Sequence, residues 1–412
     1  MSTLWAVLQL LVLGFASWRS AECIPSPIAV RIGNVTLPNN SVSRRMKLAL
    51  GTPAKPVAFM PHWPLNNTMI YGTSGFCDLG PEKFTQKGCI TFRGVDSATF
   101  PQMSFVADSL KLNDNLSLTN FPMGIALNNW GEQRYTPQMV IGMGANSTFL
   151  SALKSSGKIA VHSFRIFWGR QGANSKTQLD GNIVFGGYDR AKVSGQPYTQ
   201  SISPDRAICP TGMLVIIIDM ILNLPNGTNT SIFTGSRSAS ISAYLVLDYP
   251  VLMTLPLNPY FSTFRNLTGA KLPGRSFGLN FFAVRYSDAT DTPYNGNLTF
   301  KFQSGLAVQI PNDQLANFTE PTLVINPIQD INGNDLVQLG RQFLSSAYLT
   351  VNEDTGSFSL WAANPTGREE LVGFGKAGEE STDFCPGAEQ CTAPSRRRQG
   401  YQSESLATAD YK

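Results

Sequence analysis

Short runs of apolar residues recur along the chain, many alternating with polar ones, and each is bounded by glycine, proline, asparagine or aspartate. This pattern is typical of β-strands, because strands are short and turn formers separate them. The run at 213–224 carries Asp219 and is too short to span a bilayer, so we expect a buried pair of strands there. We expect the other strands at residues 57–60, 69–72, 90–94, 103–108, 163–169, 181–187, 244–249, 281–286, 298–302, 347–351 and 358–363.

Helical patterns are few and short. Residues 147–156 begin with a capping Asn-Ser pair, carry apolar residues on one face and stop at Gly157. Residues 259–267 place four apolar residues on one face before Gly269, which predicts a second helix. Residues 340–347 predict a third by the same pattern. The predicted fold class is therefore all-β with a few short helices.

Composition narrows the class of protein. The chain has 412 residues, of which 42% are hydrophobic and 15% charged, with 36 glycines, 26 prolines and a net charge of +4. This apolar share and low net charge exclude a disordered chain, and the low charged content excludes a coiled coil. Because 32 basic residues face 28 acidic ones with no basic face, we expect no nucleic-acid partner. The length favours two domains of about 150–200 residues.

The N-terminal segment, residues 1–21, is predicted to be a signal peptide. Residues 4–16 are almost entirely apolar, which suits a signal-peptide core and is too short for a membrane span. No other apolar run is long enough, so we expect no transmembrane segment. Ten Asn-X-Ser/Thr sequons also favour a secreted, extracellular glycoprotein, and they lie at Asn34, Asn39, Asn66, Asn115, Asn146, Asn226, Asn229, Asn266, Asn297 and Asn317.

The six cysteines fit an oxidising compartment. Since cysteines close in sequence often pair, we expect two bridges, Cys77–Cys89 and Cys385–Cys391. Whether Cys23 and Cys209 pair or stay free is left open. No Cys-X-X-Cys motif occurs and the chain has only two histidines, so neither a metal site nor a cofactor is predicted.

Four ordered segments carry a resemblance to a known family. Residues 48–57 predict a strand, a Gly-Thr-Pro turn and a strand, and residues 139–164 predict a strand, a Gly-X-Gly turn, a short helix and a strand. Residues 180–189 predict a strand closed by Phe-Gly-Gly-X-Asp, and residues 338–361 predict a strand, a short helix and a hairpin. In this order and spacing they resemble the pepsin-like aspartic protease family, and in particular a secreted, fungal-type member.

The resemblance implies a two-lobed pepsin-like fold. Its N-terminal β-lobe would span residues 22–195 and its C-terminal β-lobe residues 196–375. Residues 376–412 are rich in small and charged residues, so we expect a disordered tail there.

The chemistry of the family needs one aspartate from each lobe. One ionised carboxylate activates water while the protonated one polarises the peptide carbonyl. In the first lobe the matching loop contains Met60, Pro61 and His62, none of them acidic, and no acidic residue occurs anywhere from Cys23 to Cys77. His62 is a possible base in principle, although a lone histidine beside tryptophan and proline more often packs.

In the second lobe, Asp248 falls at or within one residue of the position of the family's aspartate. Pro250 stands where the family has glycine, and proline cannot adopt a positive φ. Asp248 is therefore interpreted as a remnant of the catalytic residue or as an exposed loop aspartate. The tyrosine of the family's flap is also missing, because no tyrosine occurs between Gly72 and Arg134.

One Asp-Thr-Gly-Ser sequence, at 354–357, lies between two alternating apolar runs. Aspartate and glycine in that setting are typical of a hairpin turn, so we expect no catalytic role for it.

The leading hypothesis is a secreted, monomeric, catalytically inactive glycoprotein that binds a peptide, a protein or a polysaccharide between its lobes. The resemblance supports such a role, since plant xylanase inhibitors use a pepsin-like fold for binding. Two alternatives stay open. One is a divergent active aspartic endopeptidase. The other is a cell-surface ectodomain, with a spanning segment missing before the basic run at 396–398.

Overall fold

The structure is a computed structural model. It describes residues 23–36, 42–63, 65–70, 103–126, 139–171, 177–233, 240–249, 251–270, 272–276, 281–285, 293–317, 322–323, 325–328 and 336–385. The predictions for the signal peptide, the Cys77–Cys89 bridge, Asn39, most of the flap region and the tail beyond residue 385 lie outside these residues.

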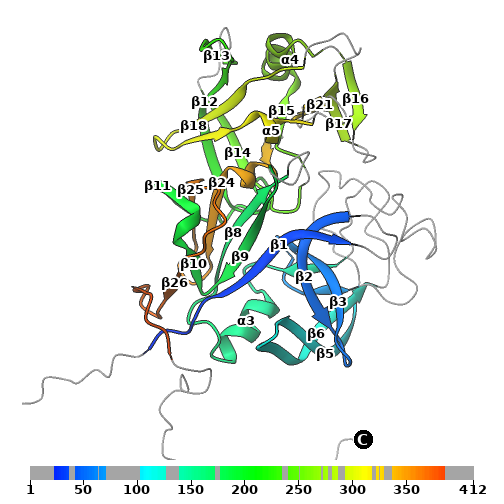
Figure 1. Cartoon of the computed structure of the whole chain (residues 1–412), viewed down its shortest axis with the longest axis vertical. Helices are drawn as coiled ribbons and strands as arrows, with labels where there is room; N and C mark the ends of the chain where they lie inside the picture. The colour runs from blue at the N-terminus through cyan, green and yellow to red at the C-terminus, as the bar shows by residue number, and fades with distance from the viewer. Residues whose placement is uncertain are drawn as a thin grey trace, which may run out of the picture.

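A sheet of 12 strands runs through the first lobe and the middle of the molecule (Figure 1). Strand β24, from near the C-terminus, pairs with the first-lobe strand β8 on one side and with β25 on the other, so the two halves of the chain share this sheet. In sheet order the strands are β11 (Val193–Ser201), β25 (Ser357–Ala363), β24 (Ala347–Asn352), β8 (Ser163–Arg170), β9 (Leu179–Phe185), β1 (Ile28–Thr36), β2 (Val42–Leu50), β3 (Lys55–His62), β7 (Val140–Gly142), β4 (Met69–Ile70), β6 (Leu116–Ala126) and β5 (Met103–Asn113).

A second sheet, of eight strands, forms the second lobe, at the top of Figure 1. The apolar run at 213–224 forms one continuous strand, β12, and the prediction of a strand pair there is wrong. The strands are β19 (Ala307–Ile310), β18 (Asn297–Phe302), β12 (Leu214–Asn223), β14 (Ile241–Leu245), β23 (Val337–Leu339), β15 (Met253–Pro256), β22 (Ile325–Ile328) and β13 (Asn229–Ser231), which pairs with β12.

Two smaller sheets complete the fold, and the prediction of an all-β, two-lobed molecule is confirmed. One sheet contains β16 (Leu272–Ser276), β17 (Phe281–Arg285), β21 (Thr322–Leu323) and β20 (Ala316–Asn317). The other contains β10 (Gly187–Asp189), β26 (Leu371–Phe374) and β27 (Glu380–Ser381).

The helices are short, as predicted. Helix α3 (Thr148–Ser155) begins where the Ser147 side chain accepts a hydrogen bond from the backbone N–H of Leu150, a standard N-cap. Helix α4 (Ser262–Thr268) ends at Gly269, whose φ of 72° is left-handed and suits a C-cap. The remaining helical segments are Arg190–Lys192, Leu257–Phe261, α5 (Asn312–Leu315) and Phe343–Ser345.

Buried apolar side chains from both lobes form one continuous cluster. Trp63, Trp168 and Tyr348 are the largest fully buried side chains in the described residues.

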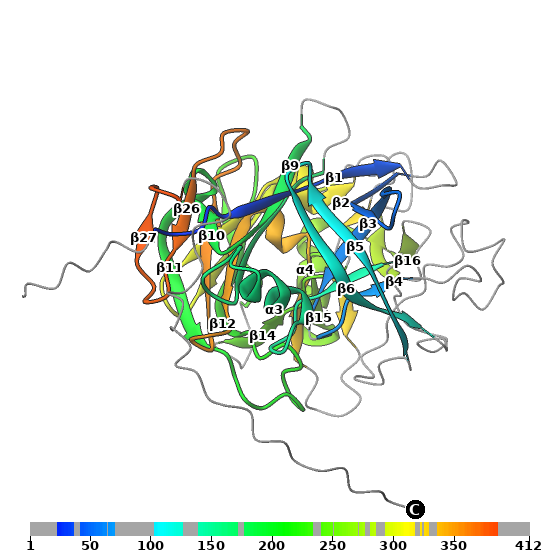
Figure 2. The same cartoon turned by 90° about the horizontal axis from the view of Figure 1, so that it is seen from below.

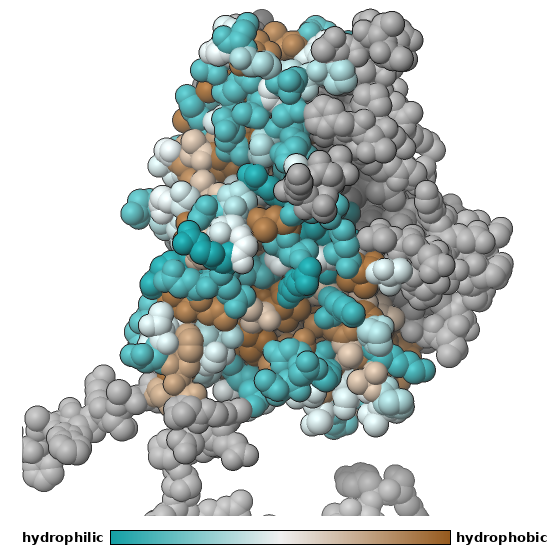
Figure 3. Space-filling model, in the orientation of Figure 1, coloured by the Kyte–Doolittle hydropathy of each residue, from teal (hydrophilic) through white to brown (hydrophobic). Residues whose placement is uncertain are grey.

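Helix α3 lies below the sheet strands, as the view from below shows (Figure 2). Hydrophilic residues cover much of the face seen in Figure 3, while apolar residues gather mainly in its lower half. Within the described residues, no helix has the length and apolar character needed to cross a bilayer.

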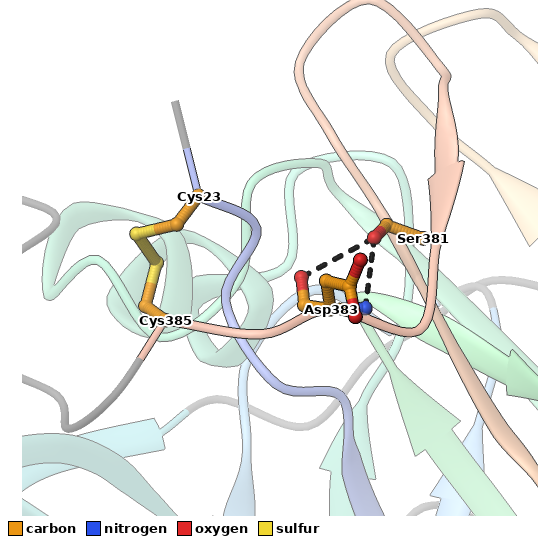
Figure 4. The surroundings of a disulfide bond; sticks show 4 residues. All are labelled: Cys23, Ser381, Asp383 and Cys385. Atoms are coloured by element: carbon orange, nitrogen blue, oxygen red, sulfur yellow. Dashed lines mark hydrogen bonds between the residues drawn. A yellow bond between two sulfur atoms is a disulfide. The ribbon is translucent and has the colours of Figure 1, made fainter. Parts of the chain in front are cut away.

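The two ends of the described chain are joined by a disulfide between Cys23 and Cys385 (Figure 4). The prediction of a Cys385–Cys391 bridge is therefore wrong. A backbone hydrogen bond of 3.0 Å from Cys385 N–H to the Ile24 carbonyl sets the two segments side by side, and the two Cα atoms lie 5.0 Å apart. The pairing of the two chain ends, and not closeness in sequence, therefore decides which cysteine bonds to Cys385. Cys209 is a free, buried thiol.

The described sequons divide by exposure. Asn66 and Asn297 are half-buried, and each side-chain oxygen accepts a backbone N–H, from Asn146 and Asn312 respectively. The exposed ones are Asn34, Asn115, Asn146, Asn226, Asn229 and Asn266.

Candidate active site between the lobes

Each lobe contains three strands with the same pairing pattern. In the first lobe, β7 pairs in parallel with β3 and antiparallel with β4. In the second lobe, β23 pairs in parallel with β14 and antiparallel with β15. In both cases a later strand inserts between two strands that a loop connects. The two lobes therefore repeat one structural unit, and the loop that leaves β3 corresponds to the loop that leaves β14.

A glycine supports each of these loops. A Cβ on Gly142 would lie 2.6 Å from the carbonyl atoms of Asn66, and a Cβ on Gly340 would lie 2.1 Å from the carbonyl oxygen of Val251. Real Cβ atoms do not approach backbone so closely, so only glycine allows the loop to rest on the end of the inserted strand. These are the glycines of the predicted Gly-X-Gly and Leu-Gly segments.

His62 and Asp248 meet where the two loops face each other. His62 is the last residue of β3, and Asp248 lies in the turn that follows β14. The imidazole Nδ1 of His62 is 3.0 Å from Oδ2 of Asp248, and the side chains are only 1% and 3% exposed. The interpretation of Asp248 as an exposed loop residue is therefore wrong, and His62 does more than pack, since it holds the carboxylate of the other lobe.

Pro61 is compatible with its strand because the strand does not need a hydrogen-bond donor at this position. Met60 donates its N–H to Met139, 2.9 Å away, and the carbonyl of His62 accepts the N–H of Met143 at 3.0 Å. Residue 61 lies between these two hydrogen-bonding residues and is not required to donate to β7, so the missing N–H of proline costs no hydrogen bond. Met60 is fully buried. The non-acidic first-lobe sequence thus forms a regular, well-packed strand end.

The residue after each member of the pair is aromatic and buried, and the next is proline. The two loops read His62-Trp63-Pro64 and Asp248-Tyr249-Pro250, and both aromatic side chains are buried. The indole N–H of Trp63 donates a hydrogen bond of 2.9 Å to the carbonyl of Thr211, just before the second-lobe strand β12. Trp63 therefore makes a second contact across the lobe boundary.

The chemistry of this pair differs from that of two carboxylates. Two carboxylates close together share one proton, because both cannot ionise, and this supplies an acid and a base at once. An imidazole and a carboxylate instead form an ion pair or share a hydrogen bond, so this pair contains no second carboxylic acid that could polarise a substrate carbonyl. Both groups are also shielded from solvent. A water molecule or a peptide would reach them only if the loops opened.

The Asp-Thr-Gly-Ser sequence lies away from this pair, in the turn between β24 and β25. The Asp354 carboxylate accepts hydrogen bonds from Lys154 Nζ at 2.8 Å and from the His162 backbone N–H at 3.0 Å. Burial alone would raise the pKa of Asp354, but these hydrogen bonds lower it overall. The sequence thus lies in a hairpin turn, as predicted, and Lys154 additionally connects that turn to α3.

Sequence reasoning missed two charged groups, Arg206 beside Trp63 and the partly buried Glu353 in the turn between β24 and β25. The guanidinium of Arg206 lies 5.9 Å from the centre of the Trp63 ring. Burial raises the pKa of Glu353 from 4.5 to about 7, while the charge of Arg206 opposes that rise. Neither residue belongs to a motif, so only the packing reveals them. Among the described residues, no cluster of three His, Cys, Asp or Glu side chains is arranged to hold a metal ion.

Comparisons with known proteins agree with this architecture. Candidapepsin-1 of Candida albicans strain WO-1 is 25% identical over 238 residues, which is 54% of this chain and 53% of that protein. Secreted aspartic protease 1 of Candida albicans matches to the same extent. The chain thus spans about half the length of the curated relatives it matches. No protein-family model matches the sequence.

A solved structure supports the fold independently. The crystal structure of an aspartic proteinase from Irpex lacteus superposes with a TM-score of 0.54 at 14% sequence identity, and the superposition covers 84% of this chain and all of the other. At this identity the likeness concerns the fold alone.

Proposed function

With the chain placed in the pepsin-like aspartic protease family, we propose that it is a secreted, catalytically inactive member that acts by binding. The observation that carries the proposal is the buried pair of His62 and Asp248 at the point where the two lobes meet. The family's reaction requires two carboxylates that share a proton. Here one of the two groups is an imidazole.

Burial strengthens the proposal. The imidazole and the carboxylate are 3.0 Å apart and shielded from water, so exposing either one to a substrate would break a buried contact. The pair therefore closes the loops on each other instead of holding a water molecule ready for attack.

The secreted location rests on the signal-peptide pattern, on the exposed sequons and on the disulfide. Disulfides persist in oxidising compartments, and the matched Candida protein is named a secreted protease. The resemblance to a fold that other proteins use for binding supports the proposed ligand class. A peptide, a protein or a polysaccharide would lie between the lobes, with the chain acting as a monomer.

The test is cleavage of a generic peptide pool from pH 3 to pH 7, followed by mass spectrometry, with and without pepstatin. The expected result is no pepstatin-sensitive cleavage at any pH. A Candida secreted aspartic protease serves as the positive control. Pepstatin-sensitive turnover that disappears in Asp248→Asn would refute the inactive assignment and establish an active, divergent endopeptidase.

Binding is measured separately with the wild-type protein. The probes are the same peptide pool and a set of soluble plant and fungal polysaccharides, each offered to the immobilised chain. Retention of a defined subset of peptides or of one polysaccharide is the expected result. Retention of neither would leave the chain without the proposed binding role.

A further inference from the structure

One face of the 12-stranded sheet is lined with uncharged polar side chains where the sheet reaches β11, at the left of Figure 1. Thr199 of β11 lies opposite Ser359 of β25, which in turn lies opposite Thr350 of β24. Residues two positions along each strand point to the same side of the sheet, so they extend this row into a continuous surface. Its exposed and half-buried members, which we call the plate, are Thr199, Ser201, Asn352, Ser357, Ser359 and Trp361.

The plate faces away from the candidate site. The ring of Trp63, the residue after His62, packs against Phe164 of β8, with the ring centres 6.1 Å apart. Arg165, the next residue of β8, points to the other side of the sheet and lies opposite Thr350. The plate and the candidate site therefore lie on opposite sides of the sheet, and a site on the plate is separate from the one that the proposed function uses.

None of the six side chains of the plate is charged. Arg165 continues one row of the plate, but its side chain is buried and donates to Ser163 Oγ at 2.6 Å. Its guanidinium carbon lies 4.2 Å from the centre of the Phe374 ring, from β26. Strand β11 is the edge of the sheet, where natural proteins often place lysine, yet Val193–Ser201 contains no charged residue. The plate and its edge thus lack the charge that a solvent-facing surface usually carries.

Hydroxyl groups on the plate are already linked in pairs. Thr199 Oγ1 and Ser359 Oγ lie 2.8 Å apart. Ser357 Oγ lies 2.7 Å from Oγ1 of Thr355, in the neighbouring turn. A hydroxyl has one donor hydrogen and two acceptor positions, so each pair keeps a donor and several acceptors for another molecule. Trp361, two residues beyond Ser359 on the same face, is half-buried, so the plate also offers part of an aromatic side chain.

The plate is built from two parts of the chain that contain no glycosylation sequon. All ten sequons lie outside residues 149–225 and 320–412, and these two stretches supply the strands β8, β11, β24 and β25. The one Asn-X-Thr triplet within them, at 364–366, has proline in the middle position, which prevents glycosylation. Any N-glycan on a sequon of this chain would therefore be attached outside these four strands.

We propose that the plate is a further binding site and that its ligand is a neutral polysaccharide. A sugar ring carries hydroxyl groups around its rim and C–H groups on its faces, so it matches linked hydroxyls beside an aromatic side chain. A protein partner fits less well, because protein interfaces are poor in serine and rich in large aromatic residues, methionine and arginine. A nucleic acid or an acidic polymer would need exposed basic side chains, and the plate has none.

The experiment titrates the wild-type protein with polysaccharides by isothermal titration calorimetry. The neutral probes are a soluble β-1,3-glucan, a mixed-linkage β-glucan, a galactomannan and dextran, and the acidic probe is polygalacturonic acid. We expect at least one neutral probe to bind, with an affinity that changes little between low and high salt, because the plate offers no charge to screen. Absence of binding to every neutral probe, or binding to polygalacturonic acid alone, would overturn the proposal.

Two substitutions place a bulky, charged side chain on the plate. Ser359→Arg and Thr199→Arg should each weaken binding of that polysaccharide by about tenfold or more, because the arginine would hold the sugar away from the hydroxyl pair. Ser104→Arg is the matched control, since Ser104 is an exposed serine of β5, at the other end of the same sheet. Its affinity should stay within about twofold of the wild type. Thr199 is exposed on an edge strand, so Thr199→Arg keeps the test decisive if Ser359→Arg does not fold.

The two binding sites are distinguished by the same variants. Polysaccharide binding that survives both plate substitutions would place the ligand elsewhere, such as between the lobes, which would overturn this proposal and leave the proposed function standing. Conversely, polysaccharide binding that is lost in both plate variants, while the same variants still retain peptides, would support the plate and separate it from the site between the lobes.

Discussion

Replacing Glu353 by glutamine should stabilise the protein at neutral pH. Burial raises the pKa of this carboxyl from 4.5 to about 7. Between these two values the folded protein binds a proton that the unfolded chain does not, so stability falls as pH rises. The stability that this group confers is fully present below pH 4.5 and is lost as pH rises through about 7. Since a tenfold change in proton affinity corresponds to about 1.4 kcal/mol, the raised pKa amounts to about 3 kcal/mol in total.

The assay is urea unfolding of the wild-type protein and of Glu353→Gln at pH 4.5, 6 and 8. The two proteins should have nearly equal free energies of unfolding at pH 4.5, because Glu353 is then neutral. At pH 8 the variant should be more stable by about 3 kcal/mol. Asp114→Asn, at an exposed carboxylate, controls for the loss of one negative charge. A variant that is no more stable than the wild type at pH 8 would refute the assignment of a buried, ionisable carboxyl.

Three further changes test the rest of the structure. His62→Asp should lower stability at neutral pH by about 3–5 kcal/mol, because it replaces a buried attractive pair by two carboxylates, and urea unfolding should show recovery in acid as the pair takes up a proton. Cys385→Ser should cost up to about 5 kcal/mol by opening a loop that spans 362 positions, whereas Cys391→Ser should leave the Cys23–Cys385 peptide intact in a non-reducing digest. Gly340→Ala should cost more than about 3 kcal/mol or prevent folding, while Gly367→Ala, where a Cβ meets nothing within 4 Å, should shift the melting temperature little.

The fold was predictable because its signals are local. Strand runs, turn formers and the caps of α3 and α4 are each encoded within a few residues, and the structure confirms them. The Cys23–Cys385 bridge was not predictable in this way, because its partners are 362 positions apart and only the pairing of the chain ends brings them together. The same reason explains the single strand β12, since the neighbours on both sides, β14 and β18, decide its length.

The candidate site was predictable in part. The sequence located both loops and showed that the first one has no acid. It did not show that His62 points at Asp248, because that contact joins residues from two lobes and depends on how the repeated units face each other. Burial of Glu353 was equally hidden, since an isolated acidic residue beside a turn is usually solvated.

The two loops that face each other between the lobes have matching sequences. Each now carries an ionisable residue followed by a buried aromatic residue and a proline, and the glycines that support the loops, Gly142 and Gly340, are both in place. A random loss of catalysis would remove one carboxylate and leave the other alone in a buried place, which is costly. Here the first lobe supplies an imidazole whose Nδ1 lies 3.0 Å from the Asp248 carboxylate. The arrangement therefore keeps a buried contact between the lobes without a pair of carboxylates, which is the feature on which the proposed binding function rests.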